Sequence, residues 1–518
     1  MLDLLIRGGR VIDGAGNPWY RADVGIAAGR IAAVRRVDEP ARRVIDADGL
    51  FVCPGFVDMH THSDLQLLVN PAHEAKVLQG VTLDVIGQDG LSYAPVTDDV
   101  LEQLREQLAA WNGDPPGFDW SWRTVGEYLD RLDADGIAVN AAYLAPHGTI
   151  RMCAMGTDDR APTADELAHM KRLLAEALQD GAVGLSTGLT YTPGMYADDD
   201  EIVALLEVVG EHGGYYTPHH RNYGRRAMEA YSDCIEIARR SGVPLHLAHA
   251  HLGHEINRGR TPELLALIDQ ARDDGIEVTL DTYPYLAGST YLAAFLPSWM
   301  HVGGTAATID RLRDADLRER LRAEIEDEGS DGFHEIPMDW SLIVVDGRPI
   351  SEAAAVAGAR PIDYVCELLA ERNLAVSCVA HTGNEENVRM TMAHWSHTVG
   401  SDGILVGDRP HPRGWGTFPR FFAVYVRELG ILGWEQAVRK MTSLPAQRLG
   451  FPDRGLLRPG MSADVTCIDP ETIRDTATYE DPRRQPEGIP YVLVNGVAVV
   501  DGGKHTGALA GRALRASR

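Results

Sequence analysis

The segment GFVDMHTHSD, residues 55–64, holds two histidines separated by one residue, His60 and His62. The apolar run before them is typical of a β-strand, and side chains two residues apart in a strand face the same side. Both imidazoles can therefore enter one space at the carboxyl end of the strand, as metal ligands do. A turn with two hydrogen-bonded imidazoles would give the same pattern, so other residues must decide.

Three further residues stand at predicted strand ends. His219 ends YYTPH, His249 ends VPLHLAH, and Asp402 stands in HTVGSDG. In a barrel of parallel strands the carboxyl ends meet at one face, where barrel enzymes carry their active sites. Imidazoles and a carboxylate at that face predict a zinc-type hydrolytic site, because such a metal polarises a carbonyl and lowers the pKa of bound water to about 7.

The elements that must position these residues alternate between helix and strand. One unit has a capping box from Thr163 to Glu166, an apolar helical face, a stop at Gly181 and the short strand AVGLS. Such alternation implies a parallel sheet. Nine strand candidates, one more than an eight-stranded barrel needs, end at His60, Ile86, Leu144, Ser186, His219, His249, Asp281, Ala380 and Asp402. We predict that the surplus strand is AVSCVA at residues 375–380.

The two chain ends share a different pattern. LLIRGGRVIDG near the start and YVLVNGVAVVDGG near the end both read as strand, glycine turn, strand. We predict one small β domain from residues 1–52 and 451–518, beside a barrel over residues 53–450. A departure from the alternation at about residues 286–345 predicts an insertion that caps the site.

Composition narrows the classes of partner. A chain of 518 residues exceeds what one core supports, and its formal charge of 49 − 75 = −26 repels nucleic acid and anionic lipid. The six cysteines form no C-x-x-C pair, and no run of about 18 apolar residues occurs. We therefore expect a soluble cytoplasmic protein with a small-molecule substrate and neither a nucleic-acid nor a membrane partner. A homo-oligomer is compatible with the sequence.

Taken together, the motifs resemble those of the N-acyl-D-amino acid deacylases (D-aminoacylases) of the amidohydrolase superfamily. The resemblance covers nearly the whole chain and implies a metal-binding (β/α)8 barrel beside a small β-sandwich. It also implies hydrolysis of the amide bond of N-acyl-D-amino acids, with L-Xaa-D-Xaa dipeptides as further candidates. Its motifs are LLIRGGRVIDG, GFVDMHTHSD, GVTLDVIGQDG, GLSTGLTYTPGMYA, DTYPYLAGST, VGSDG, HPRGWGTFPR, MTSLPAQRLG and GLLRPGMSADV.

The resemblance also implies metal-site roles. His60 and His62 match the family's His-x-His pair, and His219 and His249 match the two histidines that hold its tightly bound zinc. Asp402 matches the catalytic aspartate, which is also a candidate metal ligand. The implied cofactor is one or two Zn2+ ions, with Mn2+ or Co2+ as alternatives.

Two substrate contacts follow from the same resemblance. Arg413, in HPRGWGTFPR, matches an arginine that recognises the substrate carboxylate, and Tyr283, in DTYPY, matches a tyrosine that contacts the substrate. A planar guanidinium suits a carboxylate because it can donate two parallel hydrogen bonds.

The sequence departs from the family at three points. GQDG places Asp89 where the family typically has a cysteine ligand in G-N-C-G. Asp89 is either a ligand that could be shared between two ions or an unligated carboxylate of the pocket, which leaves the number and identity of the metals open. AHAH places His251 where the family often has a lysine. Phe295 and Leu296 stand near where acid-specific relatives have an arginine, so apolar D-amino acids are the expected substrates.

Two other functions remain open at this point. A cyclic amidase of the hydantoinase or dihydroorotase type shares the fold but typically uses a carboxylated lysine, whereas GLSTG occupies the fourth strand here. A non-catalytic scaffold would not need the histidines and Asp402. Of the remaining polar residues, His147 is expected to hydrogen-bond within its loop, and Tyr191 either contacts substrate or packs on its Gly/Pro loop.

Overall fold

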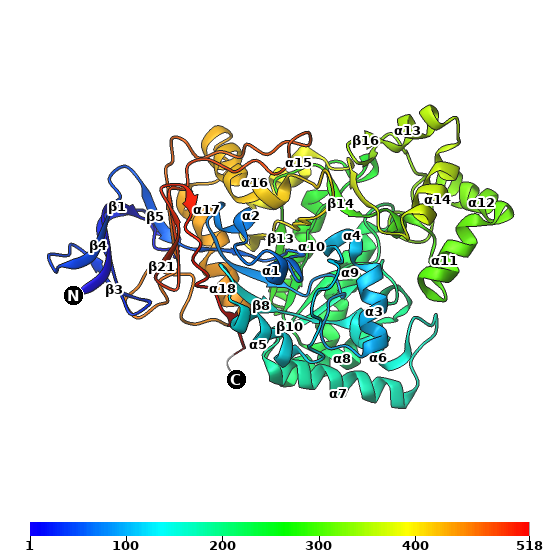
Figure 1. Ribbon diagram of the computed structural model, residues 1–518, viewed down its shortest axis with the longest axis horizontal. Coiled ribbons are helices and arrows are strands. Elements are labelled where there is room, and N and C mark those ends of the chain that lie inside the picture. Colours follow the sequence, from blue (N-terminus) through cyan, green and yellow to red (C-terminus); the bar gives the residue numbers. More distant parts are fainter. Residues whose placement is uncertain (517–518) are drawn as a thin grey trace.

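The computed structural model describes residues 1–516. Strands from both chain ends lie together at one end of the molecule, and a barrel occupies the middle (Figure 1). Helices from α11 (Gly304–Arg313) to α14 (Pro361–Glu371) lie at the opposite end. The predicted (β/α)8 barrel with a separate sheet-rich domain is confirmed.

A nine-stranded sheet joins the two ends of the chain. β5 pairs antiparallel with β19, so that Phe51 lies opposite Ile468. Apolar side chains from both ends, including Ile6 and Leu493, fill one core, which confirms that both termini build one β domain. The strands are β1 (Leu2–Val11), β2 (Tyr20–Ala27), β3 (Arg30–Arg35), β4 (Ala41–Asp46), β5 (Phe51–Pro54), β19 (Val465–Ile468), β20 (Tyr491–Val494), β21 (Val497–Asp501) and β22 (Lys504–His505).

Parallel strands close the central barrel. β8 and β9 make one of its eight positions, because only Leu144 separates them. The ring closes between β18 and β6, where the Met59 amide donates to the Val399 carbonyl at 3.1 Å and Thr61 bridges to Gly403. The strands are β6 (Phe56–Asp58), β7 (Val81–Ile86), β8 (Asn140–Tyr143), β9 (Ala145–Pro146), β10 (Gly184–Gly188), β11 (Tyr215–His219), β12 (Leu245–Leu247), β13 (Val278–Thr282) and β18 (His397–Val399).

Helices cover the barrel between these strands. The predicted capping box of α7 is present, with Thr163 and Glu166 each bonding the other's backbone, and the helix ends at Gly181. The helices are α1 (Gln66–Val69), α2 (Glu74–Val77), α3 (Asp98–Gln107), α4 (Ala109–Asn112), α5 (Val125–Asp135), α6 (His147–Met155), α7 (Ala164–Asp180), α8 (Asp199–Glu211), α9 (Ala227–Ser241), α10 (Thr261–Asp273), α15 (Glu385–Ala393), α16 (Arg413–Arg420), α17 (Trp434–Met441) and α18 (Ser443–Leu449).

The surplus strand candidate lies outside the barrel, as predicted. It forms β17 (Ser377–Ala380), which pairs antiparallel with β14 (Gly288–Tyr291) and β15 (Ile343–Val345). A fourth strand, β16 (Arg348–Pro349), completes this small sheet. The barrel therefore takes its last strand from β18, which carries the chain toward Asp402.

The small sheet belongs to a long excursion between β13 and α15. The excursion also contains α11, α12 (Ala315–Arg322), a π-helix (Ala323–Glu328), α13 (Ile350–Ala357) and α14. Because β17 pairs with β14 and β15, the excursion continues past residue 345, where the sequence had suggested its end, to Ala380. The predicted domain boundaries at residues 52 and 450 stay predictions.

The C-terminal segment returns to the barrel after leaving the β domain. Strand β23 (Ala513–Leu514) pairs in parallel with β8, and the Ala516 amide donates to the Gly181 carbonyl at 3.0 Å. The last described residues thus contact two parts of the barrel: strand β8 and the segment that precedes β10. Residues 451–516 therefore serve both the β domain and the barrel.

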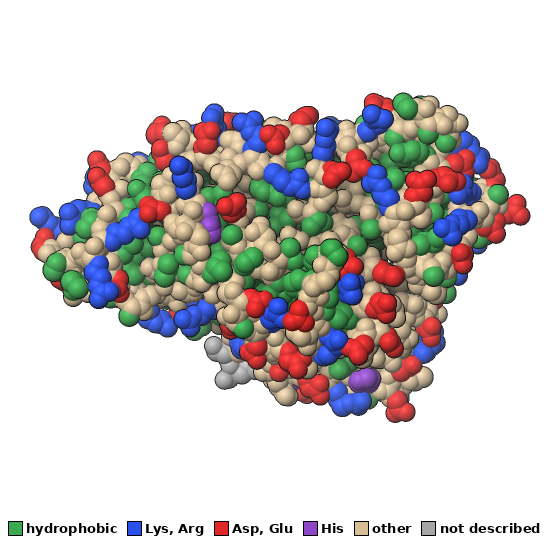
Figure 2. Space-filling model, viewed as in Figure 1, with side chains coloured by type: hydrophobic (Ala, Val, Ile, Leu, Met, Phe, Trp, Pro, Cys, Tyr) green, Lys and Arg blue, Asp and Glu red, His purple; other side chains and the backbone are tan. Residues whose placement is uncertain are grey.

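The surface carries charge of both signs. Figure 2 shows acidic side chains over α7 and α12, with basic side chains scattered among them. Over residues 1–516, no helix combines the length and apolar character needed to cross a bilayer.

The close passage of the C-terminal segment over β8 predicts a sensitive position. A Cβ added at Gly511 would lie 1.9 Å from the Val139 carbonyl oxygen, so Gly511→Ala must displace backbone. We expect the free energy of unfolding to fall by about 1–3 kcal/mol, measured by urea denaturation. The control is Gly433→Ala, whose Cβ would meet only Glu435 Oε2 at 3.5 Å. Equal stability of the two variants would contradict this packing.

Candidate metal centre and active site

The structure brings all six predicted metal ligands together at the carboxyl ends of the barrel strands. His60 and His62 follow β6, Asp89 follows β7, and Asp402 follows β18. The two remaining histidines end β11 or follow β12. The ligands form two groups, one of His60, His62, Asp89 and Asp402 and one of Asp89, His219 and His249.

The first group places two imidazoles beside two carboxylates. His62 Nε2 lies 3.2 Å from Asp402 Oδ1 and 3.4 Å from Asp89 Oδ2. His60 Nε2 lies 3.5 Å from Asp89 Oδ1 and 3.8 Å from Asp402 Oδ1. Both nitrogens therefore face the space between the carboxylates.

The second group uses the same Asp89 carboxylate. His219 Nδ1 lies 3.5 Å from Asp89 Oδ2, and His249 Nε2 lies 3.4 Å from Asp89 Oδ1. The two histidine nitrogens are 3.1 Å apart. Asp89 therefore stands between the groups, in the position of a bridging ligand.

These residues fit metal ions. Ligand atoms about 2.1 Å from a tetrahedral ion lie about 3.4 Å from one another, close to the separations observed in both groups. Two of the atoms that face the groups, His60 Nε2 and Asp89 Oδ1, are buried without a hydrogen-bond partner among the described residues. Buried polar atoms are costly when unpaired, and metal coordination would satisfy them.

The backbone at this site is strained. Asp89, His249 and Asp402 have φ values of 55°, 31° and 48°, in a region that non-glycine residues seldom occupy. Gly87 and Gly90 permit the turn at Asp89, because a Cβ on either would lie within 2.5 Å of the neighbouring backbone. These unfavourable backbone conformations point the three side chains toward the space between the two groups.

Neighbouring hydroxyl groups orient two of the histidines. Thr190 Oγ1 lies 2.7 Å from His219 Nε2, and Tyr223 OH lies 3.2 Å from His249 Nδ1. Each bond occupies the ring nitrogen that faces away from Asp89, leaving the other nitrogen for a metal. The sequence analysis did not identify Thr190 or Tyr223, because their contacts depend on how the loops pack.

Asp281, on β13, supports the site from below. It accepts a hydrogen bond from the His249 amide at 2.9 Å, and its other oxygen lies 2.9 Å from His246 Nε2. That second oxygen is 3.8 Å from His60 Nδ1. Asp281 is thus a buried carboxylate that lies next to one histidine of each group, His60 of the first and His249 of the second.

Burial and charge set the protonation of the centre. Burial lowers the pKa of His60 to about 4, so its ring is neutral near pH 7. Burial also lowers the pKa of His62, but hydrogen bonds to Asp402 and Asp89 outweigh it and raise the pKa to about 9. Burial raises the pKa of Asp89, but the nearby histidines outweigh it and hold the pKa well below its usual range. The carboxylate is therefore ionised, as a metal ligand must be.

Arg413 lies directly beside Asp402. Its Nη1 is 2.9 Å from Asp402 Oδ2, and its Nη2 donates to the Ser289 carbonyl at 3.0 Å. Its guanidinium is fully buried and stacks 4.5 Å from the Tyr283 ring centre. Tyr283 lines the catalytic cavity, whereas Arg413 is not among the described lining residues. Their roles in substrate binding stay predictions.

His251 does not replace the charge of a lysine. Its ring lies 4.4 Å from the Tyr283 ring and forms a short hydrogen bond with the Thr282 hydroxyl. Burial lowers its pKa to about 3, so the imidazole is neutral near pH 7. The neutral His251 therefore leaves the charge for a substrate carboxylate to Arg413, whose predicted role this is.

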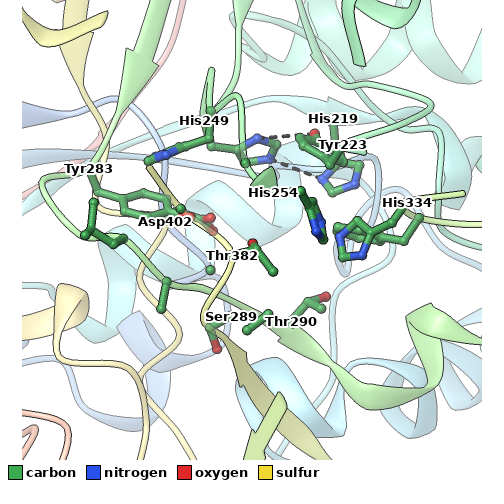
Figure 3. Close-up of a pocket in the computed structure, with 18 of the residues that line it drawn as sticks. His219, Tyr223, His249, His254, Tyr283, Ser289, Thr290, His334, Thr382 and Asp402 are labelled. Atoms are coloured by element: carbon green, nitrogen blue, oxygen red, sulfur yellow. Dashed lines mark hydrogen bonds between the residues drawn. The ribbon is translucent and has the colours of Figure 1, made fainter. Parts of the chain in front are cut away.

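The catalytic cavity runs between Tyr283 and a pair of histidines, His254 and His334 (Figure 3). Phe295 lines it, while Leu296 is buried but is not among its described lining residues. The sequence analysis gave no role to His254 and did not consider His334, which lies far along the inserted segment. Only the folded excursion brings His334 to the cavity.

Two residues left open by the sequence analysis can be placed. His147 Nε2 lies 2.8 Å from Glu201 Oε1 on α8, and His147 begins α6, so the prediction of a hydrogen bond within its own loop is wrong: the bond joins two helices. Tyr191 lines the cavity, and its hydroxyl lies 2.9 Å from Thr290 Oγ1. Its ring packs 4.5 Å from that of His219.

Two grouped sets of imidazoles and carboxylates at the carboxyl face of a (β/α)8 barrel define a metal-dependent hydrolase. The chain belongs to the amidohydrolase family, whose model matches residues 43–500. This confirms the resemblance that the motifs indicated.

Two curated relatives match nearly the whole chain. The D-aminoacylase of Alcaligenes xylosoxydans xylosoxydans is 37% identical over 521 residues, which cover 99% of this chain and 97% of that protein. The N-acyl-D-glutamate deacylase of the same organism is 37% identical, over 96% of this chain and 93% of that protein.

Solved structures agree with these matches. A structure of D-aminoacylase that addresses the role of its binuclear metal centre has a TM-score of 0.84 and 34% identity, and covers 100% of both chains. The N-acyl-D-glutamate deacylase of Bordetella bronchiseptica, solved with zinc and a phosphonate mimic of the tetrahedral intermediate, has a TM-score of 0.85 and 35% identity. It covers 99% of this chain and 100% of that chain.

The shared position of Asp89 predicts a joint loss of metal and activity. Asp89→Ala removes the carboxylate that both groups use, so metal bound per chain and turnover should fall together. Asp89→Cys should partly restore zinc, because a thiolate is a soft ligand that favours zinc, whereas a carboxylate also accommodates manganese or cobalt. Metal per chain is measured by elemental analysis after equal loading.

The control for these variants is Asp99→Ala, which removes the same charge from an exposed position on α3. It should keep the wild-type metal content. Full metal occupancy in Asp89→Ala would show that Asp89 is not a ligand.

Proposed function

We propose that this enzyme hydrolyses the amide bond of N-acyl-D-amino acids, a C–N bond other than a peptide bond, and releases a carboxylate and a free D-amino acid. The observation that carries this proposal is the pair of candidate metal-ligand groups that share Asp89. Asp402, a member of the first group, lies 2.9 Å from the Arg413 guanidinium. The names of the relatives, D-aminoacylase and N-acyl-D-glutamate deacylase, support the substrate class.

The proposed cofactor is zinc, as one or two ions, with manganese or cobalt as alternatives. His219, His249 and Asp89 would hold one ion, and His60, His62 and Asp402 would hold the other with Asp89 shared. When bound, such an ion polarises the scissile carbonyl and makes water acidic enough to attack near neutral pH.

Asp402 is the proposed proton carrier. It accepts the proton of the attacking water and returns it to the departing amine nitrogen, because an amine leaves slowly as its anion. Burial raises the pKa of Asp402, but the Arg413 charge and the His62 hydrogen bond outweigh it and hold the pKa below its usual range, so the carboxylate is ionised and has a free lone pair for the proton. Arg413, at 2.9 Å, holds one of its oxygens in place, and the other oxygen faces His62 Nε2 at 3.2 Å across the proposed metal position.

Arg413 and Tyr283 are the proposed contacts for the carboxylate of the D-amino acid. A substrate carboxylate would compete with Asp402 for the guanidinium, while the Tyr283 hydroxyl could donate a further hydrogen bond. With the carboxylate held on one side of the carbonyl, the substituent on the α carbon can point only one way, which selects one enantiomer.

The cavity walls favour an apolar side chain in the substrate. Leu286, Ala287 and Ala380 line the cavity near Tyr283, and the described lining residues include neither lysine nor arginine. Arg413, which lies outside that set, is assigned to the α-carboxylate, so neither a lysine nor an arginine of the set remains to pair with the side-chain carboxylate of D-glutamate or D-aspartate.

A cyclic amidase is less well supported by the site. Strand β10, which spans GLSTG, contains no lysine that could be carboxylated to bridge two metals. Two hydantoinase structures that match this chain are 18% and 16% identical and show the fold alone.

Replacing the proton carrier should stop turnover without unfolding the protein. Asp402→Asn keeps the shape but removes the proton acceptor, so we expect kcat to fall by about 10²–10⁴-fold. Circular dichroism and metal content check that fold and metal are retained. Asp408→Asn, an exposed position in the same loop, is the matched control. Near-normal turnover of Asp402→Asn would refute the assignment.

The enzyme should select for chirality and for an apolar side chain. We expect N-acetyl-D-leucine to be hydrolysed with a higher kcat/KM than N-acetyl-D-glutamate, by at least about tenfold, because an unpaired carboxylate in an apolar site is costly. The L enantiomers should be poor substrates. Steady-state kinetics on the four compounds decide the matter, and a preference for D-glutamate or for either L form would contradict the prediction.

A further inference from the structure

A second cavity adjoins the catalytic cavity. His254, His334 and Thr382 line both, so these residues form the wall between them. Beyond the wall the second cavity is lined mainly by apolar side chains, namely Ile256, Ile336, Pro337, Met338, Leu342 and Ile343. The first cavity is thus lined by candidate metal ligands, whereas the second is lined mainly by apolar side chains.

The arrangement of the catalytic cavity gives the substrate a direction. In Figure 3, Tyr283 lies on one side of Asp402, while His254 and His334 lie on the other. Arg413 stacks on Tyr283, so a substrate carboxylate bound there lies on the side away from His334. The acyl group, attached at the opposite end of the scissile amide, then points toward the wall.

Aromatic rings line the way from the metal ligands to the wall. The Phe333 ring lies 5.4 Å from that of His219 and 5.1 Å from that of Tyr223. The Phe295 ring lies 5.4 Å from Phe333 and 5.3 Å from His334. An acyl chain leaving the centre therefore meets an apolar surface before it reaches the second cavity.

His254 in the wall is unusual in two ways. Its backbone has φ 62° and ψ 155°, a combination that is rare outside glycine, and its amide donates to the Thr382 carbonyl at 2.5 Å. Its Nε2 is buried without a hydrogen-bond partner among the described residues, so no bond at that atom fixes the ring. Its ring contacts that of His334 at 4.3 Å between centres. A strained backbone therefore places the His254 ring between the two cavities, and no hydrogen bond at Nε2 among the described residues holds that ring.

The second cavity opens near exposed apolar residues. Ile256 is 49% exposed and Leu342 is 37% exposed, and both line this one cavity rather than lying scattered over the surface, which is the arrangement typical of a binding surface. The charged lining residues have partners of their own. Glu255 pairs with Arg258 at 2.7 Å, Arg225 donates to the Glu335 carbonyl at 2.9 Å, and Asp339 accepts from the Ser341 hydroxyl at 2.6 Å. The apolar surface is therefore the part left to bind a ligand.

We propose that the second cavity is the acyl subsite of this enzyme, and that it takes medium- and long-chain aliphatic acyl groups, hexanoyl and longer, which enter it by displacing the His254 ring from its contact with His334. This inference rests on the proposed function, because it assigns the acyl part of the same substrate. The exposed apolar residues would be covered by the acyl chain, which accounts for their position beside the catalytic cavity.

The test is a series of N-acyl-D-leucines from acetyl through butanoyl and hexanoyl to octanoyl. Burial of each added methylene should raise kcat/KM by up to about fourfold until the cavity is filled. We expect octanoyl-D-leucine to exceed acetyl-D-leucine by at least about tenfold. Glycyl-D-leucine, whose acyl part is polar, should be poorer than the butanoyl compound.

Variants locate the effect. Ile256→Asp and Leu342→Asp each place a charge on the apolar surface, so the octanoyl-to-acetyl ratio of kcat/KM should fall at least about fivefold. The control is Val356→Asp on α13, which is 79% exposed and lies outside the lining of both cavities, and it should leave the ratio unchanged. Thermal unfolding checks that all three variants fold.

The possible failures can be told apart. Hydrolysis of acetyl-D-leucine with a flat or falling chain-length series would overturn the acyl subsite and leave the proposed function standing, as would a preference for glycyl-D-leucine. If kcat/KM rises with acyl-chain length but neither Ile256→Asp nor Leu342→Asp lowers the octanoyl-to-acetyl ratio, the acyl group does not bind in the second cavity. If no N-acyl-D-amino acid in the series is hydrolysed, the proposed function and this inference both fall.

Discussion

The centre of this molecule depends on one buried carboxylate. Asp89 is 3% exposed, and its oxygens lie 3.4–3.5 Å from nitrogens of four histidines, His60, His62, His219 and His249. Removing a carboxylate from water is costly unless charges or hydrogen bonds compensate it. Four imidazoles around one acid provide that compensation when metals are bound between them. The barrel provides the geometry, because strand ends far apart in sequence reach the same small volume.

The surrounding structure serves to keep this arrangement fixed. Glycines at positions 87 and 90 allow the turn that presents Asp89, since the neighbouring backbone leaves no room for a side chain. Thr190 and Tyr223 bond the outward nitrogens of two histidine ligands, and Asp281 holds the His249 amide. The site is therefore positioned by strands and their buried partners, which hold ligands more rigidly than a free loop would.

The long excursion after β13 supplies much of the cavity wall beside the proposed metal centre. Its strands β14 and β17 supply Ser289, Thr290 and Ala380 to the catalytic cavity, and the segment between the π-helix and β15 supplies Phe333 and His334. Under the proposed function, selectivity for the two ends of a substrate would depend on this segment, whose paired strands are about 90 residues apart along the chain, from Gly288 to Ala380.

The sequence by itself determined the parts of the protein that depend on local pattern. The His-x-His spacing, the capping box of α7 and the histidines at strand ends predicted the barrel and its ligands, because strand and helix periodicity fix which side chains share a face. Tertiary structure alone decided that Arg413 pairs with Asp402, that Asp89 faces four histidines, and that His334 closes the cavity. These contacts join segments far apart in the chain, and no local spacing specifies which of many distant residues will pack together.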